Sequence, residues 1–236
     1  MSRATSFFGG SVRVGKTSYC IKYVCEKPVA LWEASAGAFV ATVVASPSGA
    51  GKSVLLGTIY DRLRGAQART AEVRFDFSPD LDRLDLVSVG YVPQNAPLVK
   101  HWRVKALLPA QSEFLKCFFP GDRHVSVLES SLGQLSGGEC RKLYACSALE
   151  RLAASRSADS YLLMDETFDG LGASEASRCL SEIQTVWSTN RTNPLHVMVV
   201  SHLDESDIKI GVNRPGNLFL DRGETKMGTM TVAVHN

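Results

Sequence analysis

Short apolar runs alternate with helix-like runs along most of the chain. A continuous apolar run such as 195–200 predicts a buried strand, and an alternating run such as 71–77 predicts a strand with one face in water. Strands are expected at 18–25, 29–33, 38–45, 71–77, 85–92, 161–164 and 195–200, with a closing hairpin of 218–224 and 230–234. Helices are expected at about 53–64, 134–154 and 174–189. This alternation predicts a mostly parallel α/β sheet that binds ligands at the carboxyl ends of its strands.

The segment between 95 and 133 is helical in character but poorly periodic. Its apolar residues allow two interpretations, an exposed cluster that contacts a partner or the core of a small helical lobe. They are Trp102, Leu107, Leu108, Phe114, Leu115, Phe118 and Phe119. Both interpretations stay open from the pattern alone.

The first 25 residues contain basic and hydroxyl side chains and no acid. The basic residues are Arg3, Arg13, Lys16 and Lys22. Such a composition resembles an organelle transit peptide. The preferred interpretation is a short disordered lead into the first strand.

Composition is that of an ordinary globular chain. Its 236 residues are 44% hydrophobic and 21% charged, which is enough for a sizeable core in one domain or two lobes. A net charge of +2 gives no strong attraction to nucleic acid. No apolar run is long enough to predict a transmembrane helix. The six cysteines have no paired C-x-x-C spacing, so buried free thiols in a reducing compartment are expected, with Cys20 and Cys25 as a possible close pair.

A glycine-rich stretch at 46–53 lies between the predicted strand 38–45 and a helix-like run. Strand, glycine-rich turn and helix form the context of a phosphate-binding loop, whose backbone N–H groups and helix N-terminus attract phosphate. Lys52 is expected to reach the terminal phosphates, and the Ser53 hydroxyl is expected to bind Mg²⁺. The predicted ATP-binding residues of this loop are Ser48, Gly49, Ala50, Gly51, Lys52 and Ser53.

A competing stretch at 10–17 matches the phosphate-loop pattern at every position and would use Lys16. It lacks an apolar strand before it, and the residues after it alternate like a strand. We therefore interpret it as a coincidence. The stretch at 46–53 departs from the pattern only at Ser46, where serine is acceptable if its φ is negative.

Further motifs follow the phosphate loop in a fixed order. After Lys52 come Gln94, the sequence Leu-Ser-Gly-Gly-Glu at 135–139, the Asp-Glu pair at 165–166 and His202. This order resembles that of ATP-binding cassette (ABC) ATPases, over about residues 23–223. The Leu-Ser-Gly-Gly-Glu sequence before a helix is the most specific of these motifs.

The resemblance implies a role for each residue around the phosphates of ATP. Asp165 ends an apolar strand and would hold Mg²⁺ through water, together with Ser53 and Gln94. Glu166 would act as general base on the attacking water. His202 would contact the γ-phosphate and orient that water, and Gln94 would link the helical lobe to the nucleotide.

The Leu-Ser-Gly-Gly-Glu signature implies a second subunit. Ser136, Gly137 and Gly138 lie at a predicted helix N-terminus, where N–H groups approach an anion closely. In the family this signature meets the ATP held by the opposite subunit, so we expect a head-to-tail dimer of identical or homologous chains. Tyr23, or failing that Tyr19, is expected to be the aromatic platform for adenine.

The implied fold is α/β, a P-loop NTPase core of ABC type with an antiparallel β lobe and an inserted α-helical lobe. We expect one ABC ATPase domain over 1–236. Its β and ATP-core lobe would cover about 17–94 and 150–236, and its α-helical lobe about 95–149.

The loop after Glu166 departs from the family pattern. The family places an aspartate where this chain has Gly172, or the aspartate is displaced to Asp169. Together with Ser46, this departure predicts altered communication between the two sites and slow hydrolysis.

Three functions compete. The first is the ATP-binding subunit of an ABC transporter, partnered by a multi-spanning membrane subunit, cytoplasmic and peripheral on the inner face of a membrane, with a mitochondrial location as the alternative. The second is a soluble ABC ATPase that drives assembly or remodelling of a protein complex. The third, another P-loop enzyme such as a small-molecule kinase, is disfavoured by the signature at 135–139. ATP and Mg²⁺ are the expected cofactors, and no nucleic-acid partner is expected.

Overall fold

A computed structural model describes residues 3–13, 20–34, 39–45, 51–64, 74–78, 87–95, 99–201, 217–222 and 229–235. The strands in this part of the chain are β1 (Arg3–Arg13), β2 (Cys20–Ala34), β3 (Phe39–Ala45), β4 (Arg74–Ser78), β5 (Val87–Val92), β6 (Asp159–Asp165), β7 (Leu195–Ser201), β8 (Asn217–Arg222) and β9 (Thr229–His235). The α-helices are α1 (Lys52–Leu63), α2 (Glu113–Phe118), α3 (Arg123–Glu129), α4 (Gly137–Ala154) and α5 (Ala173–Asn190). Two 3₁₀ turns are η2 (Val104–Ala106) and η3 (Leu132–Gln134).

All described strands form one mixed sheet, in the order β4-β1-β2-β9-β8-β3-β7-β6-β5. Strands β3, β7, β6 and β5 are parallel neighbours, as the alternation of strands and helices predicts. The expected antiparallel β lobe is wrong. Among the described strands, antiparallel pairs occur within β4-β1-β2 and in the β8–β9 hairpin. Both belong to the same sheet because β9 pairs with β2 and β8 with β3, each in parallel.

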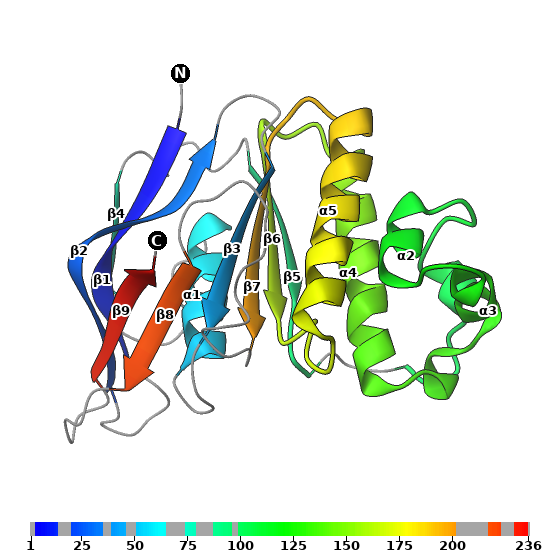
Figure 1. Ribbon diagram of the computed structural model, residues 1–236, viewed down its shortest axis with the longest axis horizontal. Helices are drawn as coiled ribbons and strands as arrows, with labels where there is room; N and C mark the ends of the chain where they lie inside the picture. Colours follow the sequence, from blue (N-terminus) through cyan, green and yellow to red (C-terminus); the bar gives the residue numbers. More distant parts are fainter. Residues whose placement is uncertain are drawn as a thin grey trace.

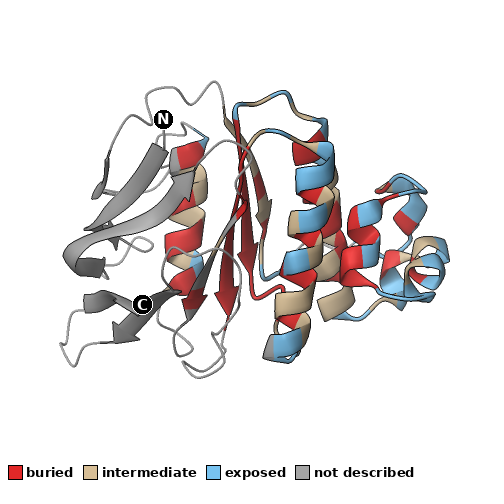
Figure 2. Ribbon diagram, turned by 45° about the horizontal axis from the view of Figure 1, so that its top comes forward, coloured by how far each residue is buried: buried red, intermediate tan, exposed pale blue. Residues whose placement is uncertain are grey.

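Helices cover both faces of the parallel strands. Figure 1 shows α1 on one side of β3, β7 and β6, and α4 with α5 on the other. Every residue of β6 and β7 is buried, because a parallel strand covered on two faces has no side in water. Figure 2 shows the same distribution, with buried residues in these strands and on the inward sides of the helices. The core therefore lies between the sheet and α4 and α5, around Trp187 and Leu149.

The apolar side chains of the helical segment between β5 and α4 join the main core. Most of the apolar cluster predicted there is buried, so the exposed-cluster interpretation is wrong for those residues. The buried members are Leu108, Phe114, Leu115, Phe118 and Phe119. Trp102 differs, with 48% of its surface exposed.

The N-terminal segment is a strand, so the predicted disordered lead is wrong. β1 pairs with β2 on one side and with β4 on the other, and these long-range backbone hydrogen bonds give no local sequence signal. The two short strands expected at 18–25 and 29–33 are one continuous strand, β2. Gly10 lies inside β1 opposite Tyr23, so the first half of the competing 10–17 motif is strand and not a phosphate-binding turn. Lys16 lies outside the described residues.

Four cysteines are buried free thiols, as predicted: Cys117, Cys140, Cys146 and Cys179. The side chains of Cys20 and Cys25 fall outside the described part of the chain. Within the described ranges, no helix is both long enough and apolar enough to cross a membrane.

Candidate nucleotide-binding site

The N-terminus of α1 carries the end of the predicted phosphate loop. Gly51 has φ +79°, a left-handed conformation that only glycine adopts without strain, and its carbonyl accepts a hydrogen bond from Leu55 N–H at 3.0 Å. Lys52 follows and is only 4% exposed, whereas Ser53 is exposed. The preceding loop residues Ser48, Gly49 and Ala50 lie outside the described residues.

Lys52 is a buried cation that faces carboxylates. Burial lowers the pKa of its ammonium, and the negative charges of Glu166, Asp169 and Asp165 partly oppose that shift. A buried lysine at a helix N-terminus is suited to bind an anionic group such as a phosphate.

Asp165 ends β6 and is only 2% exposed. Burial raises the pKa of its carboxyl, while a hydrogen bond from the Ser53 hydroxyl acts in the opposite direction. Its Oδ1 is buried and has no hydrogen-bond partner within the described ranges. A buried carboxylate oxygen beside a serine hydroxyl fits a hard divalent cation that takes its other ligands from water and phosphate. Among the described side chains, no group of three or more acidic, histidine or cysteine residues is placed to hold a metal ion.

Glu166 is held in an unusual conformation. Its φ is +52°, the left-handed region that a residue with a Cβ rarely adopts, and it is 8% exposed. The backbone N–H of Glu166 donates to the Val200 carbonyl of β7 at 3.0 Å, which fixes the start of the turn. Gln94 Nε2 donates to the Glu166 carboxylate. Sequence motifs predict both residues for the site, but only the tertiary structure brings them into contact across 72 positions.

The carboxyl ends of three strands meet at this edge. Asp165 of β6 lies opposite Val200 of β7, and Ser201 lies opposite Ala45 of β3. His202 follows Ser201 in the sequence and lies outside the described residues. Tyr23 lies in β2 without a described side chain, and Tyr19 lies outside the described residues.

The signature begins helix α4. Ser136 is the N-cap, and its hydroxyl accepts from Glu139 N–H at 3.2 Å while the Glu139 carboxylate accepts from Ser136 N–H at 2.9 Å. Gly137 and Gly138 have open space around them, since a Cβ added to either would meet no atom within 4 Å. The Ser-Gly-Gly end of α4 is thus preorganised and accessible to a large ligand or a partner chain.

No family model matches the sequence, and no curated protein matches it. Solved structures do match the fold. The ATP-binding cassette MJ0796, bound to ADP and Pi as a dimer, is 20% identical with a TM-score of 0.54, over 96% of each chain. A nucleotide-free ATP-binding cassette from an ABC transporter is 14% identical with a TM-score of 0.53, over 98% of this chain and 90% of that one.

This chain has the ABC ATPase fold. RNase-L inhibitor has the same fold, at 17% identity with a TM-score of 0.58, over 98% of this chain and 39% of that one. The chain thus spans about two fifths of RNase-L inhibitor but nearly the whole of the single cassette MJ0796.

The loop after Glu166 in this ABC ATPase fold explains where Asp169 lies. Asp169 N–H donates to the Glu166 carbonyl at 3.3 Å, and Gly170 follows with φ +84°. This tight turn keeps the Asp169 charge close enough to Lys52 to oppose in part the lowering of the Lys52 pKa by burial. Gly172 is the N-cap of α5. Sequence reasoning named Asp169 as a displaced loop residue but missed its contribution to the field at its own Lys52.

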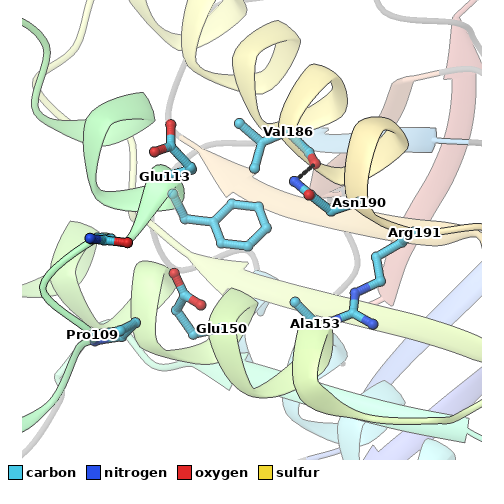
Figure 3. Close-up of a pocket in the computed structure, with 9 residues that line it drawn as sticks. Pro109, Glu113, Glu150, Ala153, Val186, Asn190 and Arg191 are labelled. Carbon is cyan, nitrogen blue, oxygen red and sulfur yellow. Dashed lines mark hydrogen bonds between the residues drawn. The ribbon is translucent and has the colours of Figure 1, made fainter.

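A separate cavity of about 320 Å³ lies between α2, α4 and α5 (Figure 3). Its lining includes Glu150, Arg191 and Phe114, and none of the predicted nucleotide-binding residues. Glu150 accepts a hydrogen bond from Ser112 at 2.5 Å. This cavity is therefore distinct from the candidate nucleotide site.

Proposed function

We propose that the chain binds Mg²⁺ and ATP and hydrolyses the ATP, as the ATP-binding subunit of an ABC transporter. The observation that carries this proposal is the convergence of buried Lys52 with Asp165 and Glu166 at the carboxyl edge of the parallel strands. Three carboxylates around one lysine leave an excess of negative charge in a buried site, which is unfavourable. A divalent cation would offset that excess and would allow a polyphosphate to bind beside Lys52.

Each side chain has a task in this proposal. Lys52 and the α1 N-terminus bind the terminal phosphates of ATP, and Ser53 with Asp165 holds Mg²⁺. Mg²⁺ bound there would supply positive charge that offsets the charge developing during phosphoryl transfer. Glu166 accepts the proton of the attacking water, and His202 orients that water. Gln94, which donates to Glu166, releases the carboxylate when a water molecule takes its place.

We place the second half of the site on a neighbouring chain. Ser136, Gly137 and Gly138 of one subunit cap the phosphates bound at Lys52 of the other. The open space around both glycines supports this arrangement, because a backbone N–H can approach a phosphate closely there. The active unit is therefore a head-to-tail dimer at the inner face of a membrane, with a multi-spanning membrane protein as its partner.

A soluble ABC ATPase that remodels a protein complex is the second candidate. It gains support from the burial of the apolar residues that would otherwise have lined an apolar groove for a membrane subunit. Affinity purification from the source cells would separate the two. Recovery of a multi-spanning membrane protein supports transport, and recovery of soluble partners alone supports remodelling.

The test of ATP hydrolysis uses two matched lysine variants. Lys52→Ala should abolish ATP binding and hydrolysis, whereas Lys16→Ala should leave both unchanged. Glu166→Gln should bind ATP without hydrolysing it and should elute as a dimer in size-exclusion chromatography with ATP. Loss of ATP binding in Lys16→Ala alone, or a Glu166→Gln monomer in ATP with its partners present, would contradict the proposal.

A further inference from the structure

The cavity between α2, α4 and α5, the interhelical cavity hereafter, carries opposite charges on two sides. Figure 3 shows Glu150 on one side and Arg191 on the other. Glu150 belongs to α4, and Arg191 is the C-cap of α5. The apolar side chains of Phe114, Ala153 and Val186 form another part of the lining. An apolar wall with a few charged groups is the usual composition of a small-molecule site.

The charges of Glu150 and Arg191 do not neutralise each other. No carboxylate in the described ranges lies within ion-pair distance of Arg191, and no basic side chain there lies within that distance of Glu150. The Nε of Arg191 is buried and has no hydrogen-bond partner among the described residues. A buried donor without an acceptor is unfavourable, and an oxygen atom of a ligand would satisfy it.

The acidic side of the interhelical cavity is held in place by the N-cap of α2. Ser112 is that N-cap, and its hydroxyl accepts a hydrogen bond from Leu115 N–H at 3.1 Å. The same hydroxyl donates to Glu150 Oε1 at 2.5 Å. The second carboxylate oxygen, Oε2, can therefore accept from a ligand while Oε1 keeps the side chain in position.

The basic side of the interhelical cavity is fixed by the turn that follows α5. Trp187 Nε1 donates to the Asn193 carbonyl at 2.9 Å, and the Asn193 amide donates to the Ser160 hydroxyl of β6 at 3.0 Å. The Trp187 ring also lies against Phe114, with ring centroids 6.4 Å apart. A site whose walls are ordered in advance loses little conformational freedom when a ligand binds.

We propose that the interhelical cavity binds a small zwitterion, a molecule with an ammonium group and a carboxylate on an apolar stem, such as a free amino acid. The ammonium donates to Glu150, the carboxylate accepts from the guanidinium of Arg191, and the stem packs on Phe114. Both polar contacts are charge-assisted hydrogen bonds, and a guanidinium can bind both oxygens of a carboxylate. This site goes beyond the proposed ATPase activity and does not depend on it.

Other ligand classes fit the interhelical cavity less well. A polyanion is repelled by Glu150 and by Glu113, which also lines the cavity. A metal ion is disfavoured by Arg191, and the described side chains form no group that could hold one. The volume of about 320 Å³ is at the lower end of known ligand sites, about 300–1,000 Å³, so it suits a molecule the size of an amino acid better than a peptide.

The test measures binding of two zwitterions, L-leucine and ε-aminocaproate, to the full chain by isothermal titration calorimetry. They share both charged groups but differ in the spacing between them, so the pair separates an α-amino acid from a longer zwitterion. At least one should bind with a Kd below about 1 mM, and at least about tenfold more tightly than hexylamine or caproate, which each lack one charge. Absence of binding by both zwitterions at about 10 mM, or equal binding of a one-charge analogue, would overturn the proposal.

Two variants of the interhelical cavity test the charged contacts. Glu150→Gln removes the negative charge but keeps an oxygen for Ser112, and Arg191→Gln removes the positive charge. Each should weaken zwitterion binding at least about tenfold. Glu150→Gln should then bind the zwitterion no better than caproate, and Arg191→Gln no better than hexylamine. A general loss of structure would not change selectivity in this way.

Matched control variants remove exposed charges outside the interhelical cavity. Glu129→Gln and Arg151→Gln should change zwitterion binding by less than about twofold. A loss in these controls as large as in the cavity variants, or unchanged affinity in both cavity variants, would contradict the proposed contacts.

The same titrations separate the interhelical cavity from the nucleotide site. Its lining contains none of the predicted nucleotide-binding residues, so Lys52→Ala and added ATP should each change the Kd of the zwitterion by less than about twofold. Competition by ATP, or loss of zwitterion binding in Lys52→Ala, would place the zwitterion in the nucleotide site and refute this inference. Zwitterion binding by a chain that never binds ATP would refute the proposed function alone.

Discussion

The left-handed backbone conformation of Glu166 is expected to reduce the stability of the folded chain. A residue with a Cβ in this region costs about 1–2 kcal/mol, which glycine avoids. Glycine loses about 0.5–1 kcal/mol more chain freedom on folding than alanine does. Glu166→Gly should therefore be more stable than Glu166→Ala by about 1 kcal/mol. Both variants remove the carboxylate and its contact with Gln94, so their difference isolates the backbone.

The measurement is urea and thermal unfolding of both variants without nucleotide. For a chain of 236 residues, about 1 kcal/mol corresponds to a rise of about 2–4 °C in Tm. Both variants should be equally inactive in ATP hydrolysis. A Glu166→Gly variant no more stable than Glu166→Ala would refute the reasoning, because it would mean that position 166 carries no strain in solution. The confirmed difference would mean that the turn holds a carboxylate where glycine would be more stable.

Three further predictions concern stability. Burial lowers the pKa of His196 from its ordinary value of 6.5 to about 4. Between these two pH values the unfolded chain binds a proton at His196 and the native state does not. As the pH falls through that range, the wild type should lose about 3 kcal/mol of unfolding free energy relative to His196→Phe in urea titrations. Ser112 caps α2 and donates to a carboxylate of α4, so Ser112→Ala should cost about 1–2 kcal/mol in thermal unfolding, whereas Ser181→Ala on the exposed face of α5 should cost less than about 0.5. Gly133→Ala should cost about 1 kcal/mol in thermal unfolding, because its Cβ would lie 3.0 Å from the Lys100 carbonyl oxygen; an unchanged Tm would refute this tight contact.

Local signals were sufficient for the elements with strong patterns. The run before the phosphate loop folds as β3, the run after it as α1, and the Leu-Ser-Gly-Gly-Glu sequence caps α4. These elements depend on nearby residues, through apolar periodicity, a left-handed glycine and a capping box. The flanking residues also explain why the motif at 10–17 could be rejected. It matches the phosphate-loop pattern, but no apolar strand precedes it and no helix-like run follows it.

The differences between the predicted and the observed strands come from pairing between segments that are not adjacent in the chain. β1 is a strand because β2 and β4 hydrogen-bond to its two edges, and neither partner is visible in its own residues. The expected antiparallel lobe became part of one sheet because β9 pairs with β2 in parallel. The sequence pattern left open whether aromatic residues such as Phe118 are exposed or buried, and the structure packs Phe118 near Phe168 in the core.

By itself, the sequence determined the strand–turn–helix around Lys52, the helix cap at Ser136 and the order of the chemical groups, because each is decided by residues close together in the chain. Only the tertiary structure decided that Gln94 reaches Glu166 and that Asp169 acts on Lys52. It also decided that Trp102 stays exposed while most of the predicted apolar cluster is buried. Those contacts join residues far apart in the chain, and their energies depend on burial and distance, which no local pattern carries.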